Sequence, residues 1–154
     1  MTITSDIFEH NPDPDNPGWY HWNLKDETLF NSSVMGRLIT RKEGKKCRLR
    51  MFPQGKHKNL RGLIHGGITL SLIDISMFTT MHVIGSGNAG PSVTLELSTQ
   101  FLEGASPDQH LDSVTEIMRE TGNLVFVRGE VVQVDNCIAS FSGIIRKFKQ
   151  RRAG

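Results

Sequence analysis

The sequence predicts a single α+β domain in which a long antiparallel sheet curves around one apolar helix. Residues 68–83 are apolar on nearly every side, over a length that suits a buried helix. Four later segments alternate apolar and polar residues, as strands with one buried face do. Residues 121–123 and 135–136 are short turn sequences, which join neighbouring antiparallel strands directly. A helix followed by a run of strands is an α+β layout.

Composition narrows the class of protein. The 154 residues fit one domain, and the formal charge of +2 is too small to indicate nucleic acid as a partner. No apolar run reaches the roughly 18 residues of a membrane span, and the start lacks a signal-peptide pattern. Cys47 and Cys137 lack the spacing of a metal site or disulfide framework. We expect a cytoplasmic protein without metal, cofactor, nucleic-acid partner or membrane partner.

The chain begins with a segment that leads into the domain. Residues 11–18 contain three prolines in polar sequence and should be extended or flexible. Trp19, Tyr20 and Trp22 follow, and aromatic residues grouped in this way more often anchor a terminal segment on a core than stack on a ligand. The expected divisions are a lead-in over residues 1–33, the domain over residues 34–150 and a basic tail over residues 151–154.

The domain should open with a hairpin formed by residues 34–40 and 46–52. Its second strand alternates apolar with basic side chains, so one face is apolar and the other basic. The predicted helix follows, and a break at residues 85–91 ends it. The expected later strands are residues 92–103, 111–120, 124–134 and 137–148.

Two glycines, Gly66 and Gly67, stand at the start of the predicted helix. Unpaired backbone N–H groups and the positive end of the helix dipole can bind a developing oxyanion there. Gly66 is the preferred donor. A tight entry turn would require the same glycines, so the pair by itself leaves both interpretations open.

Asp74 lies in mid-helix among apolar neighbours such as Leu70 and Met77. A carboxylate is costly there unless it is paired, solvated by a cleft or protonated, so Asp74 is either a partnered structural residue or an acid–base group. It stands eight residues beyond Gly66, about 12 Å along a helix, too far for both to touch one carbonyl. Two antiparallel helices across a two-fold axis would bring the two groups together, which predicts a shared site in a dimer.

These residues belong to a longer pattern. Asn59 and Gly62 precede the run from His65 to Gly67, and Asp74 follows within the helix. The pattern resembles the signature of the PaaI-like branch of the hotdog thioesterases, in the 4-hydroxybenzoyl-CoA thioesterase superfamily. The resemblance extends over about residues 36–148 and includes the strand from residue 92 and the turn and strand from residue 119. It implies a long antiparallel sheet wrapped around one central helix.

The resemblance implies hydrolysis of an acyl-CoA, with a medium-chain or aryl acyl group, to the free acid and coenzyme A. In the family, the N–H at the position of Gly66 polarises the thioester carbonyl. The aspartate corresponding to Asp74, from the other subunit, acts as general base or nucleophile. The positions of Asn59 and His65 help to place the thioester and the departing thiol. A strand hydroxyl that orients the attacking water corresponds to Thr94.

The resemblance also implies self-association, as a homodimer or a dimer of dimers, and a surface site for coenzyme A. Relatives often carry arginine at the position of Asn123, so this chain departs from them at that turn. Coenzyme A is part of the substrate, and no separate cofactor is implied. The expected substrate-binding residues are Gly67, Gly122, Asn123, Arg128, Arg146 and Lys147.

Other functions fit parts of the pattern. A non-catalytic hotdog module that binds or senses acyl-CoA is the leading alternative, although retention of Asp74 with the glycines argues against it. A hydratase would need a histidine a few residues after Asp74, and the next one is His82. A DNA-binding regulator would need an added helix-turn-helix, for which the proline-rich start is unsuited. The acyl group, the choice between base and nucleophile, and the tetramer packing stay open.

Overall fold

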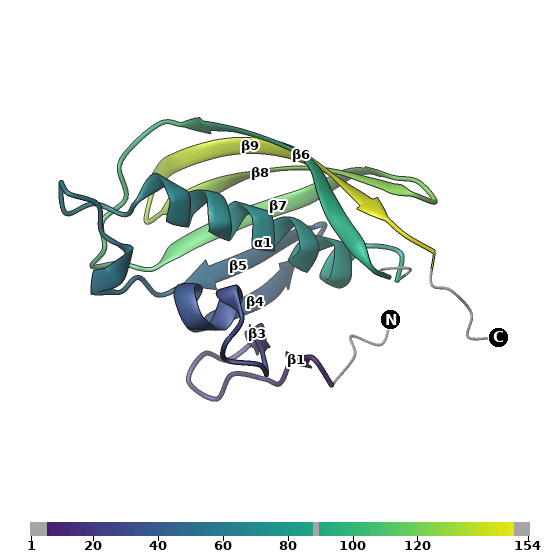
Figure 1. Cartoon of the computed structure of the whole chain (residues 1–154), viewed down its shortest axis with the longest axis horizontal. Helices are drawn as coiled ribbons and strands as arrows, with labels where there is room; N and C mark the ends of the chain where they lie inside the picture. The colour runs from purple at the N-terminus through teal and green to yellow at the C-terminus, as the bar shows by residue number, and fades with distance from the viewer. Residues whose placement is uncertain (1–5, 88–89, 150–154) are drawn as a thin grey trace.

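The computed structural model describes residues 6–87 and 90–149. A seven-stranded antiparallel sheet, in the order β2-β4-β5-β7-β8-β9-β6, curves around the long helix α1 (Figure 1). A second small sheet pairs β1 with β3. The elements are β1 (Phe8–Glu9), β2 (Tyr20–His21), β3 (Asn23–Leu24), the π-helical turn η1 (Asn31–Met35), β4 (Leu38–Glu43), β5 (Lys46–Met51), the 3₁₀ turn η2 (Gly55–His57), α1 (Gly66–Ile84), β6 (Ser92–Phe101), β7 (Leu111–Glu120), β8 (Leu124–Gln133) and β9 (Asn136–Lys147).

This architecture confirms the α+β layout, the central helix and the four later strands expected from periodicity. The helix packs mainly against β5 and β7 and approaches β6 less closely. By length and hydropathy α1 could cross a membrane. Here it is the core helix, and half of its most apolar stretch is buried inside the protein. Gly143 on β9 makes room for it, since a Cβ there would lie 2.5 Å from the Met77 side chain.

The N-terminal segment is folded onto the domain, which differs from the extended or flexible lead-in expected for residues 11–18. The buried Asp13 carboxylate accepts a hydrogen bond from the Asp15 N–H at 2.9 Å and pairs with Arg37. Trp22 enters the main core and stacks on Phe8, with ring centroids 4.9 Å apart. Backbone hydrogen bonds among Asp13, Asn16 and Trp19 close this turn, and buried polar and aromatic contacts attach it to the domain. The aromatic residues anchor this segment, as expected.

The outer face of the sheet, away from α1, is not the uniformly basic surface that β5 alone suggested. The buried carboxylate of Asp112 accepts two hydrogen bonds from Arg50, at 2.7 and 2.8 Å, and one from Arg48 at 3.0 Å. The guanidinium carbons of Arg41 and Arg50 lie 4.5 and 4.4 Å from the centroid of the Trp19 ring. Cross-strand pairing and cation–π contacts thus use the arginines structurally.

Candidate functional site

The start of α1 leaves one backbone donor unused. His65 is the N-cap, and its Nδ1 accepts a hydrogen bond from the Gly67 N–H at 2.9 Å. In the neutral ring this bond fixes the proton on Nε2. The Gly66 N–H has no acceptor within the described residues. Of the two glycine amides, only that of Gly66 is therefore free to bind a ligand oxygen at the positive end of the helix.

The neighbouring side chains give different reasons for glycine at positions 66 and 67. A Cβ on Gly67 would lie 3.1 Å from His65 Nδ1 and would press on the capping ring. A Cβ on Gly66 would lie 3.6 Å from the Phe101 ring of β6, an ordinary contact. Gly67 therefore preserves the cap, whereas the bare Gly66 keeps the approach to its own N–H open.

Asn59 holds the loop that leads into the helix. Its Oδ1 accepts hydrogen bonds from the N–H groups of Arg61 and Leu63 at 2.9 and 3.2 Å. Its own N–H donates to the Leu63 carbonyl at 2.8 Å, and Gly62 adopts a positive φ of 76° within this loop. The structure thus places Asn59 in the loop, six residues before the cap residue His65, with its side-chain oxygen used in shaping the loop.

Asp74 lies on the face of α1 that looks toward β6, half-buried and hydrogen-bonded. Thr94 Oγ1 donates to Asp74 Oδ1 at 2.7 Å. In the part of the chain that the structure describes, no Lys, Arg or His pairs with Asp74. The ladder between β6 and β9 shifts register just after Thr94, and such a bulge re-aims the side chains beside it. A carboxylate with one hydroxyl partner keeps acceptor sites for a water molecule.

A pocket of about 390 Å³ opens beside Asp74. Its walls come from the segment before β4, from α1 and from β6. Apolar side chains make up most of the lining, and the Asp74 carboxylate is its one charged group. The lining residues are Phe30, Asn31, Leu70, Ser71, Asp74, Ile75 and Leu97.

One chain does not bring Gly66 and Asp74 together. They are the first and ninth residues of the same helix, about 12 Å apart along its axis at roughly 1.5 Å per residue. Both nevertheless face β6, where Thr94 bonds to Asp74 and Phe101 borders Gly66. The expected site residues therefore form two half-sites along one strand.

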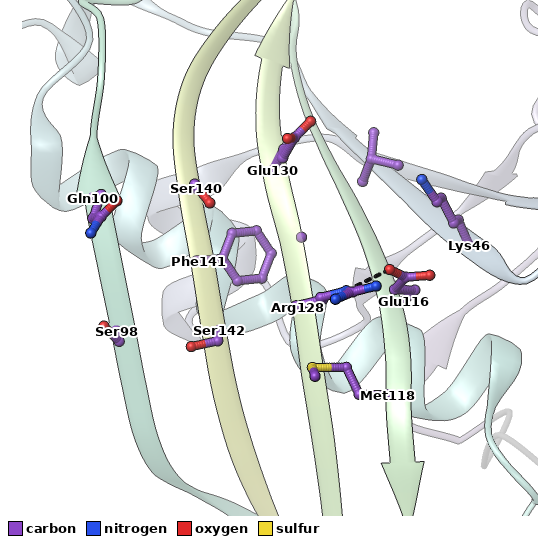
Figure 2. A pocket seen from close by; sticks show the side chains of 12 residues that line it. Lys46, Ser98, Gln100, Glu116, Met118, Arg128, Glu130, Ser140, Phe141 and Ser142 are labelled. Carbon is purple, nitrogen blue, oxygen red and sulfur yellow. Dashed lines mark hydrogen bonds and ion pairs between the residues drawn. The ribbon is translucent and has the colours of Figure 1, made fainter.

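The residues expected to contact coenzyme A separate into two places. Gly122 and Asn123 form the exposed turn between β7 and β8, and Arg146 pairs across from Leu124 at the same end of the sheet. Arg128 lies farther along β8 on the outer face, where it donates to Glu116 at 2.7 Å. The pair lines a pocket of about 550 Å³, and Figure 2 shows the two side chains pointing toward each other from neighbouring strands.

Lys147 is placed differently from the surface contact expected of it. Its side chain is buried, and Nζ donates to Glu120 at 2.7 Å. Burial favours the neutral form of Glu120, but hydrogen bonds from Lys147 and Ser86 hold the pKa of this carboxyl below its ordinary value. The Lys147 ammonium is thus committed to an internal ion pair.

The hydratase alternative gains no support from His82. Its ring lies toward the other end of α1 from Gly66, 6.2 Å from the Phe8 ring and 5.8 Å from the Trp22 ring between centroids. Burial lowers the pKa of His82, and its Nδ1 has no hydrogen-bond partner within the described residues. These contacts are with the N-terminal aromatic cluster, whereas the partner of Asp74 is Thr94.

Sequence reasoning missed His57, which connects the N-terminal turn to the helix start. This buried ring accepts from the Gln54 N–H at 2.9 Å through Nδ1 and contacts the Val34 carbonyl at 2.6 Å through Nε2. The backbone carbonyl of His57 also accepts from the His65 N–H at 2.8 Å. Because Nδ1 is an acceptor, the neutral ring donates to Val34 from Nε2. The hydrogen bond between the His57 ring and the Val34 carbonyl joins residues 23 positions apart, so no local sequence pattern predicts it.

Comparisons with known proteins add a family and a fold. The family model described as the thioesterase superfamily matches residues 61–138, slightly more than half of the chain. The comparison with curated proteins found no significant match.

Three solved structures illustrate the likeness in fold. The phenylacetic acid degradation protein PaaI of Thermus thermophilus, solved as a mutant, is 19% identical, with a TM-score of 0.64 over 76% of this chain and 97% of that one. The E. coli PaaI protein is 15% identical, with a TM-score of 0.68 over 80% of this chain and 87% of that one. Zebrafish thioesterase superfamily member 2 is 17% identical, with a TM-score of 0.69 over 80% and 89%.

Proposed function

The chain belongs to the thioesterase superfamily and has the hotdog fold of its PaaI-like members, and from this premise we propose that it hydrolyses acyl-CoA thioesters. The products are the free acid, derived from a medium-chain or aryl acyl group, and coenzyme A. The observation that carries the proposal is the bond between Thr94 and Asp74 at 2.7 Å, beside an apolar pocket. A carboxylate that has a hydroxyl partner but no cationic partner, beside an apolar pocket, suits reaction with a carbonyl better than a structural role.

The proposed reaction uses both half-sites. The free Gly66 N–H donates to the thioester oxygen and stabilises the negative charge that develops on it. As a base, Asp74 takes a proton from water while the water oxygen attacks the carbonyl carbon; as a nucleophile, it forms an anhydride that water then cleaves. In either case the C–S bond breaks, and the thiolate of coenzyme A leaves and gains a proton.

Thr94 and His65 have supporting roles in this proposal. The Thr94 hydroxyl donates a hydrogen bond to Asp74, so the lone pairs of Oγ1 can accept a hydrogen bond from the attacking water. The capping bond at His65 Nδ1 leaves Nε2–H of the neutral ring, which is exposed, to face the departing sulfur. Asn59 keeps the loop before the helix in place, with Gly67 preserving the cap.

We also propose that the active form is a homodimer, which two dimers can extend to a tetramer. Gly66 and Asp74 of one chain are too far apart to share a substrate, so a second copy must supply one of them. Strand β6 offers the surface for that copy, since it is a ten-residue edge strand with Val93, Leu95 and Phe101 exposed. Long apolar edges of this kind associate with another strand.

The same proposal covers the rest of the substrate. Arg146, the turn at Gly122 and Asn123, and Arg128 are the groups left to contact the phosphates of coenzyme A. Lys147 is buried in its ion pair, whereas Arg128 stays exposed although it pairs with Glu116. No cofactor takes part in the reaction. We also propose that the protein is cytoplasmic, since the free thiols of Cys47 and Cys137 stay reduced in that compartment.

Replacing Asp74 with asparagine tests the function. Asparagine keeps the volume and can still accept the Thr94 hydrogen bond, but it has no basic oxygen. We expect kcat to fall at least about 100-fold, with acyl-CoA binding retained. Release of coenzyme A, followed with a thiol reagent, and a binding titration on the same preparations measure both quantities.

Asp135→Asn, in the exposed turn between β8 and β9, is the matched control and should leave kcat unchanged. Hydrolysis by a folded Asp74→Asn protein within a few-fold of wild type would make Asp74 structural. Tight acyl-CoA binding by the wild type without release of coenzyme A would instead favour the sensing module.

A further inference from the structure

The pocket beside Asp74 has a wall that comes from outside the region matching the thioesterase family. Phe30 and Asn31 precede residue 61, where that match begins, yet they line the pocket together with Leu70 on α1 and Leu97 on β6. Figure 1 shows the short turn η1, which includes Asn31, lying beside α1. The chain thus contributes to its pocket a segment that the family pattern does not include.

The backbone of this turn is held in place, so the wall is fixed. Met35 at its end is fully buried, and Gly36 turns the chain away with a φ of 72°. Three hydrogen bonds hold the turn: one from the side chain of its own Ser32, and two from the adjacent residues Lys56 and His57 to its backbone carbonyls. The bonds are Ser32 Oγ to the Leu24 carbonyl at 2.9 Å, Lys56 Nζ to the Ser33 carbonyl at 2.6 Å and His57 Nε2 to the Val34 carbonyl at 2.6 Å.

Two side chains of the segment, by contrast, are not used by the fold. Phe30 is 52% exposed, although its ring is large and apolar. The Asn31 amide forms no hydrogen bond with any other residue among those described. A backbone held in this way that presents an exposed apolar ring and a free side-chain amide to a pocket is typical of a binding surface rather than of a packing element.

The chemistry of the pocket indicates which part of the substrate it takes. Its seven lining residues include no Lys or Arg, and Asp74 would repel phosphate, so the phosphates of coenzyme A do not fit there. The apolar side chains of Phe30, Leu70 and Leu97 suit an apolar acyl group. The reacting carbonyl would then lie toward Asp74, with the acyl body extending toward the turn.

We propose that Phe30 and Asn31, at the start of the turn η1, form the acyl-selecting wall of this enzyme, with Phe30 as the residue that limits the size of the acyl group. This inference rests on the proposed thioesterase function. Phe30 contacts the body of the acyl group opposite Leu97, and Asn31 lines the same wall. The substrates are acyl-CoAs whose apolar acyl group ends against the Phe30 ring.

The test compares Phe30→Ala and Phe30→Trp with wild type on straight-chain acyl-CoAs of increasing length and on an aryl acyl-CoA. Removing the ring lengthens the space, so the ratio of kcat/KM for long over short acyl groups should rise at least about tenfold. Phe30→Trp should lower that ratio. Thermal unfolding checks that each variant is folded.

Leu29→Ala is the matched control, because Leu29 is a neighbouring residue of similar exposure, 46%, that does not line the pocket. Its substrate profile should follow that of wild type. A Phe30→Ala profile parallel to wild type, or an equal shift in Leu29→Ala, would overturn the proposal.

The two proposals fail in different ways. If the wild type releases no coenzyme A from any acyl-CoA, the thioesterase function fails, and the same variants are compared by Kd for the acyl-CoA series. A long-to-short Kd ratio that changes in Phe30→Ala and not in Leu29→Ala would still support the wall. Equal Kd ratios in the three proteins would overturn the wall as well.

Discussion

Gly66→Pro isolates the backbone donor at the start of α1. Proline lacks an N–H, and Gly66 is the first helical residue, a position that proline favours. The residue before a proline must be extended, and His65 already is, with φ −61° and ψ 135°. The Gly66 N–H has no acceptor within the described residues, so the substitution breaks no hydrogen bond of the fold.

The expected effects on stability and on activity have opposite signs. A proline that fits its site restricts the unfolded chain, which stabilises a protein by about 0.4–1 kcal/mol. Loss of one oxyanion donor costs roughly 10²- to 10³-fold in kcat, equivalent to about 2.7–4 kcal/mol of transition-state stabilisation. Gly66→Pro should therefore unfold at the same or a higher temperature than wild type while losing nearly all its turnover.

Steady-state release of coenzyme A and thermal unfolding measure the two effects. Gly66→Ala is the control for bulk, since it keeps the N–H and its Cβ would lie 3.6 Å from the Phe101 ring. Alanine should lose much less activity than proline. A folded Gly66→Pro protein with kcat within a few-fold of wild type would refute the role of this amide, and equal losses in both variants would assign the effect to crowding.

Two further predictions concern assembly and pH. Mixing Gly66→Pro with Asp74→Asn should restore activity, because some mixed dimers contain one intact composite site; no recovery after demonstrated subunit exchange would exclude the shared site. Glu120→Gln leaves the buried Lys147 ammonium without its partner and should lower the free energy of unfolding by roughly 3–5 kcal/mol near pH 7. Hydrogen bonds from Lys147 and Ser86 hold the pKa of Glu120 below its ordinary value, so this ion pair contributes fully above that ordinary value and is lost as the pH falls through the lowered pKa. In urea unfolding, the deficit of Glu120→Gln relative to wild type should therefore shrink as the pH is lowered stepwise into the acid range. A deficit that stays constant down to the acid unfolding of wild type would contradict the ion pair. Glu130→Gln, at an exposed site on β8, is the control.

Periodicity was enough to predict the elements that form the core. The all-round apolar pattern of the central helix and the alternation of the later strands report burial directly, and the structure confirms them. The cost of a carboxylate in such a helix pointed to Asp74. Thr94 was assigned through the family resemblance alone, and alternation by itself does not reveal its bond to Asp74 or the register shift that follows it in β6.

Other features depended on long-range contacts. Phe30 and Asn31 reach the pocket because Lys56 and His57, more than twenty residues later, hold the turn. Lys147 was assigned to the surface from its charge, although alternation in β9 places it on the same face as the buried Ile145. That prediction gave more weight to the charge of Lys147 than to its position in the strand. The ammonium is buried because it forms an ion pair with Glu120.

The attachment of η1 through its backbone has an evolutionary consequence. Lys56 and His57 bind main-chain carbonyls of Ser33 and Val34, which every amino acid supplies. Mutations at positions 30 and 31 therefore leave those two bonds intact and leave α1 and β6 unaltered. Selection can retune the preferred acyl group through this turn while the reaction itself is inherited unchanged.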